Sequence, residues 1–358
     1  MKKNQLVTLG KHIDILSGCA FPSSGFNRNN GVPLIRIRDI LSGKTETYYE
    51  GSYDLKYLIK KGDLLVGMDG DFNREYWKGT DALLNQRVCK ITPNPETLDK
   101  NFLYHFLQKE LDKIHATTDV VTVKHLSVKK IQDIKIRLPS LKEQKRIAAI
   151  LDKADAIRQK REQAIKLADD FLRAKFLEMF GTPANNIHRF PKGTIRDLVD
   201  SVNYGTSAKA SIDSGEYPIL RMGNITYQGR WDFTDLKYLD LSVKEKDKYL
   251  VKEGDLLFNR TNSKELVGKT AVYEEDRPMA FAGYLIRVRP NSIGNNYYIS
   301  GYLNSIHGKI TLMNMCKSIV GMANINAQEL QNIEILIPPK HLQDEYEIIY
   351  KKIKKGLS

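Results

Sequence analysis

The period of the hydrophobic positions changes along the chain and divides it into regions. Between residues 1 and 141, short apolar runs such as 64–66 and 134–138 are bounded by Gly, Asn, Asp and Pro, which predicts short strands. Residues 101–113 carry apolar side chains at helical spacing and predict a helix. This mixture predicts an α/β (α+β) fold for the region.

The longest regular pattern covers residues 142–180. No Gly or Pro interrupts it, Ser140 and Glu143 have the spacing of a capping box, and Gly181 is a suitable stop. About 38 residues at 1.5 Å each give a helix of roughly 57 Å. Its apolar stripe has nearly heptad spacing and should pack along a second helix. The stripe consists of Ile147, Ile150, Leu151, Ala154, Ile157, Ala164, Ala168, Phe171 and Leu172.

The sequence beyond this helix repeats the sequence before it. A period this long exceeds the roughly 20–50 residues of solenoid repeats, so we infer that a whole globular domain was duplicated and its loops changed length. The matching segments are 32–40 with 217–225, 54–58 with 235–239, 62–65 with 254–257, and 130–144 with 329–343.

Four segments therefore make up the chain. A first domain at 1–141 precedes the spacer helix at 142–181, and a second domain at 182–339 precedes a short helix at 340–358. The predicted fold is two similar globular domains separated by a long helix, with the shorter C-terminal helix packed antiparallel to it. Two similar but different domains suggest two similar but different targets.

Charge narrows the class of target. The 358 residues carry a formal net charge of +13, spread over both copies and the helix. Such a balance favours a polyanion, with DNA or RNA first, although a basic surface without such a partner is the alternative. Cys19, Cys89 and Cys316 form no CxxC pair, and no apolar run approaches the ~18–20 residues that span a bilayer. We therefore expect a cytoplasmic protein.

Motifs for chemistry are incomplete. Gly268-Lys269-Thr270 imitates the end of a phosphate-binding loop, but Ser263 stands where that loop needs glycine, and a strand-like run follows. Residues 69–73 imitate a calcium loop that Arg74 then breaks. No His/Cys spacing suggests zinc, and no carboxylate pair stands out. A chain without metal or cofactor is expected, and a concealed nuclease site is left open.

Polar and basic residues recur just after the predicted strands of both copies. Arg, Asn and Gln can read base edges, whereas Lys, Ser and Thr suit phosphates. A solvated surface is the alternative for each residue alone. The candidate DNA-binding residues are Arg36, Arg38, Arg74, Lys78, Asn85, Gln86, Arg87 and Lys124 in the first copy, and Arg221, Asn224, Asn259, Arg260, Thr261, Asn262, Ser263, Tyr284, Arg287, Lys317 and Asn324 in the second.

The order of domain, long helix, domain and shorter helix resembles the specificity subunit of Type I restriction–modification systems, the HsdS family. Residues 138–181 resemble the family's central conserved region, from Pro139 to Ile147 and through the alanine-rich helix behind it. Pro338 and Gln343 repeat this start for the second helix. GDLLVGMDGDFN and ALLNQRVCKI resemble a first target-recognition domain, and GDLLFNRTNS with VGKTAVY resembles a second.

The resemblance implies a non-catalytic DNA-recognition subunit. Each domain would read half of a bipartite site in double-stranded DNA, and the helices would dock modification (methyltransferase) subunits, two in the family, and thereby restriction (motor–nuclease) subunits. S-adenosylmethionine, ATP and Mg would belong to those partners, with none bound by this chain. The second helix is shorter than in the family, so a modification subunit or self-association with a second copy would cover the apolar stripe. An orphan or truncated scaffold and a self-contained enzyme are the alternatives.

Overall fold

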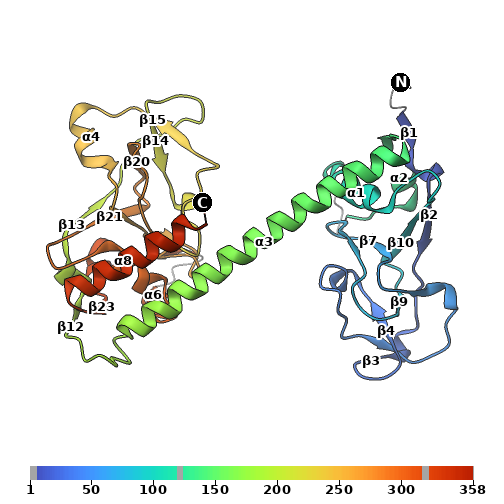
Figure 1. Cartoon of the computed structure of the whole chain (residues 1–358), viewed down its shortest axis with the longest axis horizontal. Coiled ribbons are helices and arrows are strands. Elements are labelled where there is room, and N and C mark those ends of the chain that lie inside the picture. The colour runs from blue at the N-terminus through green and yellow to red at the C-terminus, as the bar shows by residue number, and fades with distance from the viewer. Residues whose placement is uncertain (1–5, 119–123, 317–321, 358) are drawn as a thin grey trace. The chain divides into compact units, whose positions relative to one another are not determined.

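The computed structural model describes residues 6–118, 124–316 and 322–357. The chain divides into two compact units, Met1–Gln159 and Lys160–Ser358. The long helix α3 (Leu141–Phe180) runs from the first unit into the second (Figure 1).

The first unit contains two main sheets. The four-stranded antiparallel sheet has the order β2 (Ile13–Ser17), β10 (Val88–Pro93), β7 (Leu64–Gly67) and β8 (Arg74–Tyr76). The five-stranded sheet has the order β3 (Phe26–Asn27), β5 (Tyr48–Tyr49), β4 (Val32–Ile35), β9 (Ala82–Leu84) and β6 (Leu58–Ile59). Helices α1 (Lys100–Ala116) and α2 (Val128–Gln132) and the pair β1 (Leu6–Thr8) with β11 (Lys135–Arg137) complete it.

The second unit repeats this topology. One sheet has the order β13 (Val199–Tyr204), β21 (Leu285–Pro290), β17 (Leu256–Asn259) and β19 (Thr270–Val272). The other has the order β15 (Lys237–Leu239), β14 (Tyr217–Leu220), β20 (Met279–Phe281) and β16 (Leu250–Val251). Also present are β12 (Lys192–Thr194) with β23 (Glu334–Leu336), β18 (Thr261–Asn262) with β22 (Ala323–Asn324), and helices α4 (Val243–Tyr249), α5 (Asn296–Asn304), α6 (Ile306–Met315), α7 (Ala327–Gln331) and α8 (Lys340–Lys355).

Matching turns explain why the GDLL segments are the clearest part of the repeat. Gly62 and Gly254 have φ values of 89° and 87°, a conformation that glycine adopts without strain. The following aspartate accepts a bond from a backbone N–H three residues earlier, at Lys60 and Lys252, both at 2.9 Å. The two turns then lead into equivalent buried strands, β7 and β17.

One predicted match of the repeat is wrong. The identical residues 54–58 and 235–239 do not occupy equivalent strands: the first segment ends in β6, which pairs with β9, whereas the second contains β15, which pairs with β14. The true counterpart of β6 is β16, which pairs with β20 just before the second GDLL turn. The pairing with neighbouring strands, and not the identity of these five residues, decides which strand each segment forms.

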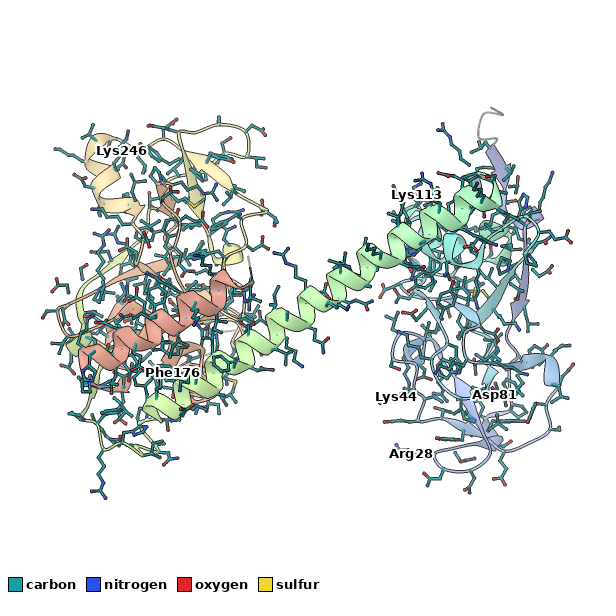
Figure 2. All side chains as sticks on the ribbon, in the orientation of Figure 1. Arg28, Lys44, Asp81, Lys113, Phe176 and Lys246 are labelled. Atoms are coloured by element: carbon teal, nitrogen blue, oxygen red, sulfur yellow. The ribbon has the colours of Figure 1, made fainter. Side chains whose placement is uncertain are left out.

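The spacer helix, at Leu141–Phe180, lies within one residue of the predicted range 142–181, and its C-terminal part packs on the rest of the second unit. Phe176, labelled in Figure 2, and Phe180 are buried against Tyr298. The ring of Tyr346, early in α8, lies 5.3 Å from that of Phe176, and Arg161 Nη2 lies 3.5 Å from the carbonyl oxygen of Leu357, just after α8. This order confirms the predicted antiparallel packing of α8 on α3.

Exposure along α3 differs from position to position of the predicted stripe. Leu172 is buried, but Ile150, Ile157 and Phe171 remain 55%, 59% and 49% exposed, so their packing against a partner stays a prediction. The sequence-based stripe omitted the buried Ala148, Phe176 and Phe180.

A buried glutamine near the start of α3 bonds that helix to the first unit, and another near the start of α8 bonds that helix to the second unit. Gln144 Nε2 donates to the carbonyl oxygens of Thr97 (3.0 Å) and Pro139 (2.9 Å), and its Oε1 accepts from Asp99 N (2.8 Å). Gln343 Nε2 donates in the same way to Ile293 (3.0 Å) and Pro338 (2.9 Å). Both side chains are fully buried. The segment from the proline to the glutamine, Pro139–Gln144 in the first copy and Pro338–Gln343 in the second, therefore makes the same packing contact in both copies.

Replacing Gln144 with leucine should destabilise the protein more than the same change at Gln343. Gln144→Leu leaves three part-buried backbone groups without their partner and Gln343→Leu leaves two, at up to about 1–3 kcal/mol for each unsatisfied group. Urea unfolding followed by circular dichroism measures both, with Lys142→Ala on the exposed side of the same helix as the control. Equal losses in the two variants would contradict the hydrogen-bond count.

Candidate nucleic-acid interface

In the first unit, strand pairing places the ends of several strands at the same edge of the sheets. β4 runs parallel to β9, with Ile35 opposite Leu84, so the chain leaves both strands at the same edge. β7 runs antiparallel to β10, so Gly67 at the end of β7 lies opposite Val88 at the start of β10. The polar residues that follow these strands therefore share one edge, which we call the first strand-end surface. It consists of Arg36, Asp69, Gln86, Arg87, Lys124 and His125.

Asp69 holds the centre of this surface together. Its carboxylate lies 3.0 Å from Arg87 Nη1 and 2.6 Å from His125 Nδ1. Lys124 joins through its backbone, because Gly70 N donates to its carbonyl oxygen, while its Nζ donates to the carbonyl oxygen of His115 at 2.6 Å. The side chains of Arg87 and His125 remain 55% and 60% exposed.

The second unit has an equivalent edge built on equivalent backbone bonds. Arg260 N donates to the carbonyl oxygen of Tyr284 (3.0 Å), as Met68 N donates to that of Arg87 (2.9 Å). Ile325 N donates to the carbonyl oxygen of Arg260 in the place of the Leu126–Met68 bond of the first unit. The second strand-end surface consists of Tyr204, Arg221, Arg260, Thr261, Tyr284 and Asn324.

Its side chains differ in chemistry from those of the first surface. The Arg260 guanidinium lies 4.8 Å from the centre of the Tyr204 ring, which is a cation–π distance. Thr261 Oγ1 donates to Asn324 Oδ1 at 3.5 Å, and Tyr284 is 55% exposed. Asn262 and Ser263 follow along the same segment, half-buried. The scaffold is shared, but the exposed groups are not.

Four predicted contact residues are buried instead. Asn85, Asn224, Asn259 and Arg287 are 7%, 3%, 0% and 4% exposed. Asn224 accepts from Arg221 N at 2.8 Å and donates to the carbonyl oxygens of Asp232 and Asp235. A base edge cannot reach side chains in such positions, so these four shape the surface and we leave them out of the interface.

Arg287 illustrates the cause of this difference. Its Nη1 donates to the carbonyl oxygen of Leu250 at 2.8 Å, and its Nε lies 3.9 Å from Asp255 Oδ2. Burial, followed by the nearby Arg289, lowers the pKa of Arg287, and Asp255 opposes that shift. Arg289 takes the closer contact with Asp255, at 2.7 Å, which raises the pKa of Arg289. Sequence alone could not distinguish an arginine inside the sheet from one at its edge.

The remaining candidates lie apart from the centre of the two surfaces. Lys78 follows β8, whose end pairs with the start of β7, so it lies at the opposite end of the sheet from Arg87. The Arg74 guanidinium packs 3.5 Å from the centre of the Tyr104 ring. Arg38 is exposed beside Asp39. Arg221, by contrast, belongs to the second strand-end surface, where Asp235 holds its Nη2 at 2.8 Å. Lys317 lies outside the described residues.

Sequence reasoning missed Asp69, His125 and Tyr204. Asp69 was considered only as a calcium ligand, although its place directly after the GDLL strand was the available signal. Tyr204 was detectable as an aromatic residue at a strand end, and it is 41% exposed. His125 was identifiable only through its contact with Asp69, which joins residues far apart in sequence.

The structure gives little support to nucleotide binding, metal binding or membrane insertion. Thr270 opens strand β19, as expected for the Gly268-Lys269-Thr270 hairpin, and Lys269 Nζ donates to the carbonyl oxygen of Met222 at 2.8 Å. Within the described residues, no group of three or more His, Cys, Asp or Glu side chains could hold a metal ion. In the same part of the chain, every helix is too short or too polar to cross a membrane.

Comparisons with known proteins agree on one family. The family described as Type I restriction modification DNA specificity domain matches residues 1–167 and 190–355. The chain is 31% identical to the Type I restriction enzyme EcoBI specificity subunit of Escherichia coli, covering 96% of this chain and 77% of that protein. It is 24% identical to the EcoKI specificity subunit of E. coli K12, covering 90% and 75%.

A solved structure has the same fold. The Type I restriction–modification system S subunit from M. genitalium aligns with a TM-score of 0.63 at 15% identity, covering 99% of this chain and 91% of that one. Because the family match includes both units and most of the helix that joins them, the chain belongs to the Type I restriction–modification DNA specificity domain family.

Proposed function

We propose that this protein is the DNA specificity subunit of a Type I restriction–modification complex and that each unit reads one half of a bipartite site. The observation that carries the proposal is the pair of strand-end surfaces. Equivalent backbone hydrogen bonds support them, yet they present different side chains. Such an arrangement suits two readers of one general kind with different base preferences.

The side chains suggest how each surface reads DNA. Gln86 and Arg87 on the first surface are exposed and can bind adenine or guanine edges through paired hydrogen bonds. On the second, Arg260 and Asn324 supply similar groups beside Tyr284. The net charge of +13 favours the phosphate backbone and predicts affinity that falls with salt. Base contacts then select the sequence within that general attraction.

The helices supply the remaining part of the proposed role. Ile150, Ile157 and Phe171 form an exposed apolar series on α3 that suits docking of modification subunits. Those subunits, and restriction subunits that join them, would bring S-adenosylmethionine, ATP and Mg. In this scheme the chain works in the cytoplasm, supplies no catalytic residue and binds no cofactor itself.

Methylome sequencing of the source strain with and without the gene tests the function directly. A bipartite motif carrying N6-methyladenine should disappear on deletion and return when the gene is restored on a plasmid. Methylation that is unchanged at every bipartite motif would refute the proposal.

Replacing residues 1–138 with the corresponding domain of a relative tests the independence of the two readers. One half of the methylated motif should change and the other should stay the same, because each half is read by a separate unit. The reciprocal control replaces residues 182–339 instead. If both halves change together in either chimera, the two-reader scheme is wrong.

Arg87→Ala should weaken binding of the specific site, with Lys78→Ala as a matched control. Both cations are about equally exposed, at 55% and 59%, and both face one carboxylate, but only Arg87 belongs to the strand-end surface. Loss of a base contact costs about 1–3 kcal/mol, or roughly 5- to 150-fold. Binding of the assembled methyltransferase to labelled duplexes measures this loss, and equal effects of the two variants would contradict the assignment of the surface.

A further inference from the structure

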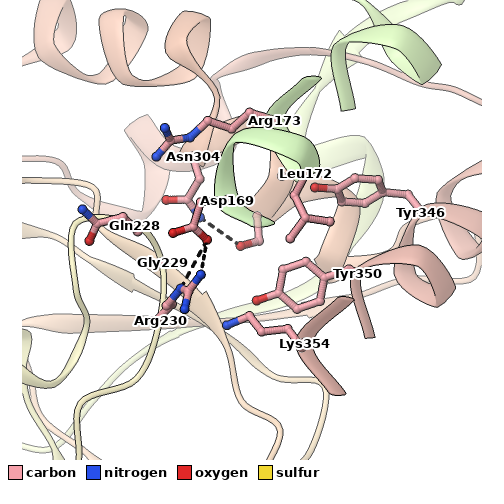
Figure 3. A pocket seen from close by; sticks show the side chains of 12 residues that line it. Asp169, Leu172, Arg173, Gln228, Gly229, Arg230, Asn304, Tyr346, Tyr350 and Lys354 are labelled. Atoms are coloured by element: carbon pink, nitrogen blue, oxygen red, sulfur yellow. Dashed lines mark hydrogen bonds and ion pairs between the residues drawn. The ribbon is translucent and has the colours of Figure 1, made fainter. Parts of the chain in front are cut away.

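Inside the second unit, one ionic contact ties the spacer helix to the loop beside the strand-end surface. Arg230 donates through Nε and Nη2 to Asp169 Oδ1 of α3, with the Nε contact at 3.2 Å (Figure 3). The same Nη2 donates to the carbonyl oxygen of Ile165, one helical turn earlier, at 3.1 Å. The Arg230 and Asp169 side chains are only 19% and 14% exposed.

The loop that carries Arg230 is itself rigid. Thr226 N donates to the Arg230 carbonyl oxygen at 2.8 Å, and Arg230 N donates back to Thr226 Oγ1 at 3.0 Å. Gly229 has φ +78°, and a Cβ there would lie 2.5 Å from Asn304 Nδ2 and 2.6 Å from the Thr270 carbonyl oxygen. The loop therefore accepts few alternative conformations, and the guanidinium is held in one place.

This loop is also bonded to the recognition edge. Asp232 N donates to the carbonyl oxygen of Asn224 at 2.8 Å, and Asn224 Nδ2 donates back to the Asp232 carbonyl oxygen at 2.8 Å. Asn224 Oδ1 in turn holds Arg221 N, where the chain leaves β14. A short series of hydrogen bonds thus runs from the second strand-end surface to Asp169 of α3.

Apolar contacts alone do not fix the orientation of the helix. Leu172, Phe176 and Phe180 bury one face of α3 on the second unit, but the hydrophobic effect has no direction. A buried ion pair often adds little stability compared with apolar side chains of similar size, whereas it can select one geometry. Asp169 lines a pocket together with Arg173, Arg230 and Lys354, and of these three cations it binds Arg230.

We propose that Arg230 and Asp169 are positioning residues that set the half-site spacing accepted by this protein, an inference that rests on the proposed function. By locking the second strand-end surface to α3, the pair removes one source of variation in the distance and rotation between the two half-sites. Without it, the second unit still folds and reads its half-site but accepts neighbouring spacings.

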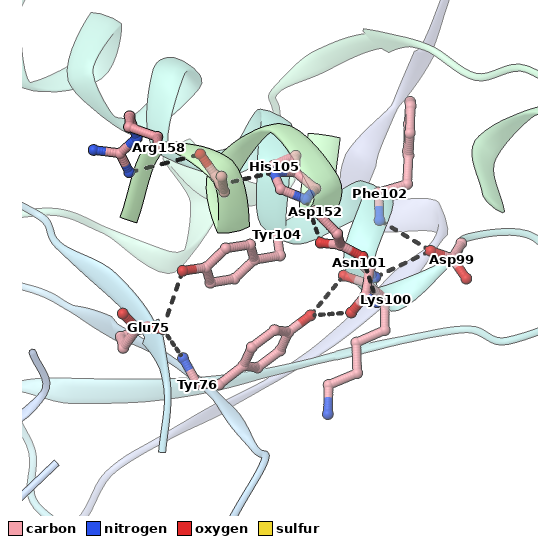
Figure 4. Close-up of polar contacts among 11 residues, drawn as sticks. Glu75, Tyr76, Asp99, Lys100, Asn101, Phe102, Tyr104, His105, Asp152 and Arg158 are labelled. Atoms are coloured by element: carbon pink, nitrogen blue, oxygen red, sulfur yellow. Dashed lines mark hydrogen bonds and ion pairs between the residues drawn. The ribbon is translucent and has the colours of Figure 1, made fainter. Parts of the chain in front are cut away.

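The first unit has a more exposed counterpart. Asp152 of α3 lies 2.7 Å from His105 Nε2 of α1 and accepts from Asn101 Nδ2 at 3.3 Å (Figure 4). Its side chain is 48% exposed, against 14% for Asp169. Solvent screens an exposed pair, so Asp169 holds its unit more firmly than Asp152 does.

The test uses the chain assembled with its modification subunit and duplexes that carry the methylated motif. Three duplexes have the native gap between half-sites, one base pair fewer and one more, a change of ~3.4 Å and about a tenth of a turn for each base pair. The double variant Asp169→Leu with Arg230→Met removes both charges at similar volume, so neither member of the pair is left as an unpaired buried charge. Asp170→Ala, the adjacent carboxylate on α3, is the control because its partner Arg173 lies on the same helix.

The double variant should bind the native gap almost as well as wild type while its preference over the altered gaps falls about tenfold. Arg230→Lys, which keeps the charge but not the forked geometry, should be intermediate. An unchanged preference would overturn the inference and leave the proposed function intact. A large drop in thermal stability with loss of binding at every gap would also overturn it, because the pair would then serve stability alone. Wild-type protein that binds no bipartite duplex would refute the proposed function itself.

Discussion

The parallel pairing of β4 with β9, and of β14 with β20, is the constraint on which the rest of the structure depends. Two parallel neighbouring strands end at the same edge of a sheet. The antiparallel strand that follows each pair begins at that edge. Polar residues scattered widely in the sequence therefore meet at one edge of each unit. With a different strand pairing, Gln86 would not lie on the same surface as Asp69, and Tyr284 would not lie on the same surface as Arg260.

Much of this architecture follows from the sequence. The bounds of α3 follow from the absence of Gly and Pro and from Gly181 at its end, and the GDLL turns fix equivalent strands in both copies. The failures have a common physical origin. Residues 54–58 and 235–239 are identical but pair with different neighbours, and Arg287 resembles a surface arginine until the sheet encloses it. Local pattern specifies elements, whereas burial and pairing depend on residues distant in sequence.

Buried polar groups decide how the elements are joined. Gln144 and Gln343 donate to backbone carbonyl groups at the starts of α3 and α8, and Arg230 donates to the Ile165 carbonyl oxygen and to Asp169 in the second half of α3. Apolar contacts accompany them: Phe176 of α3 and Tyr346 of α8 are buried with their rings in contact. Apolar burial holds the elements together, and the directional hydrogen bonds select one arrangement among those that apolar burial alone would allow.

The backbone-only bonds at the strand ends have an evolutionary consequence. Met68 with Arg87, and Arg260 with Tyr284, are joined through N–H and carbonyl groups that every residue except proline can provide. Side chains at positions 87 and 284 can therefore be exchanged without dismantling the sheet beneath them. In a lineage, these two positions can vary in sequence while the fold beneath them remains under separate selection.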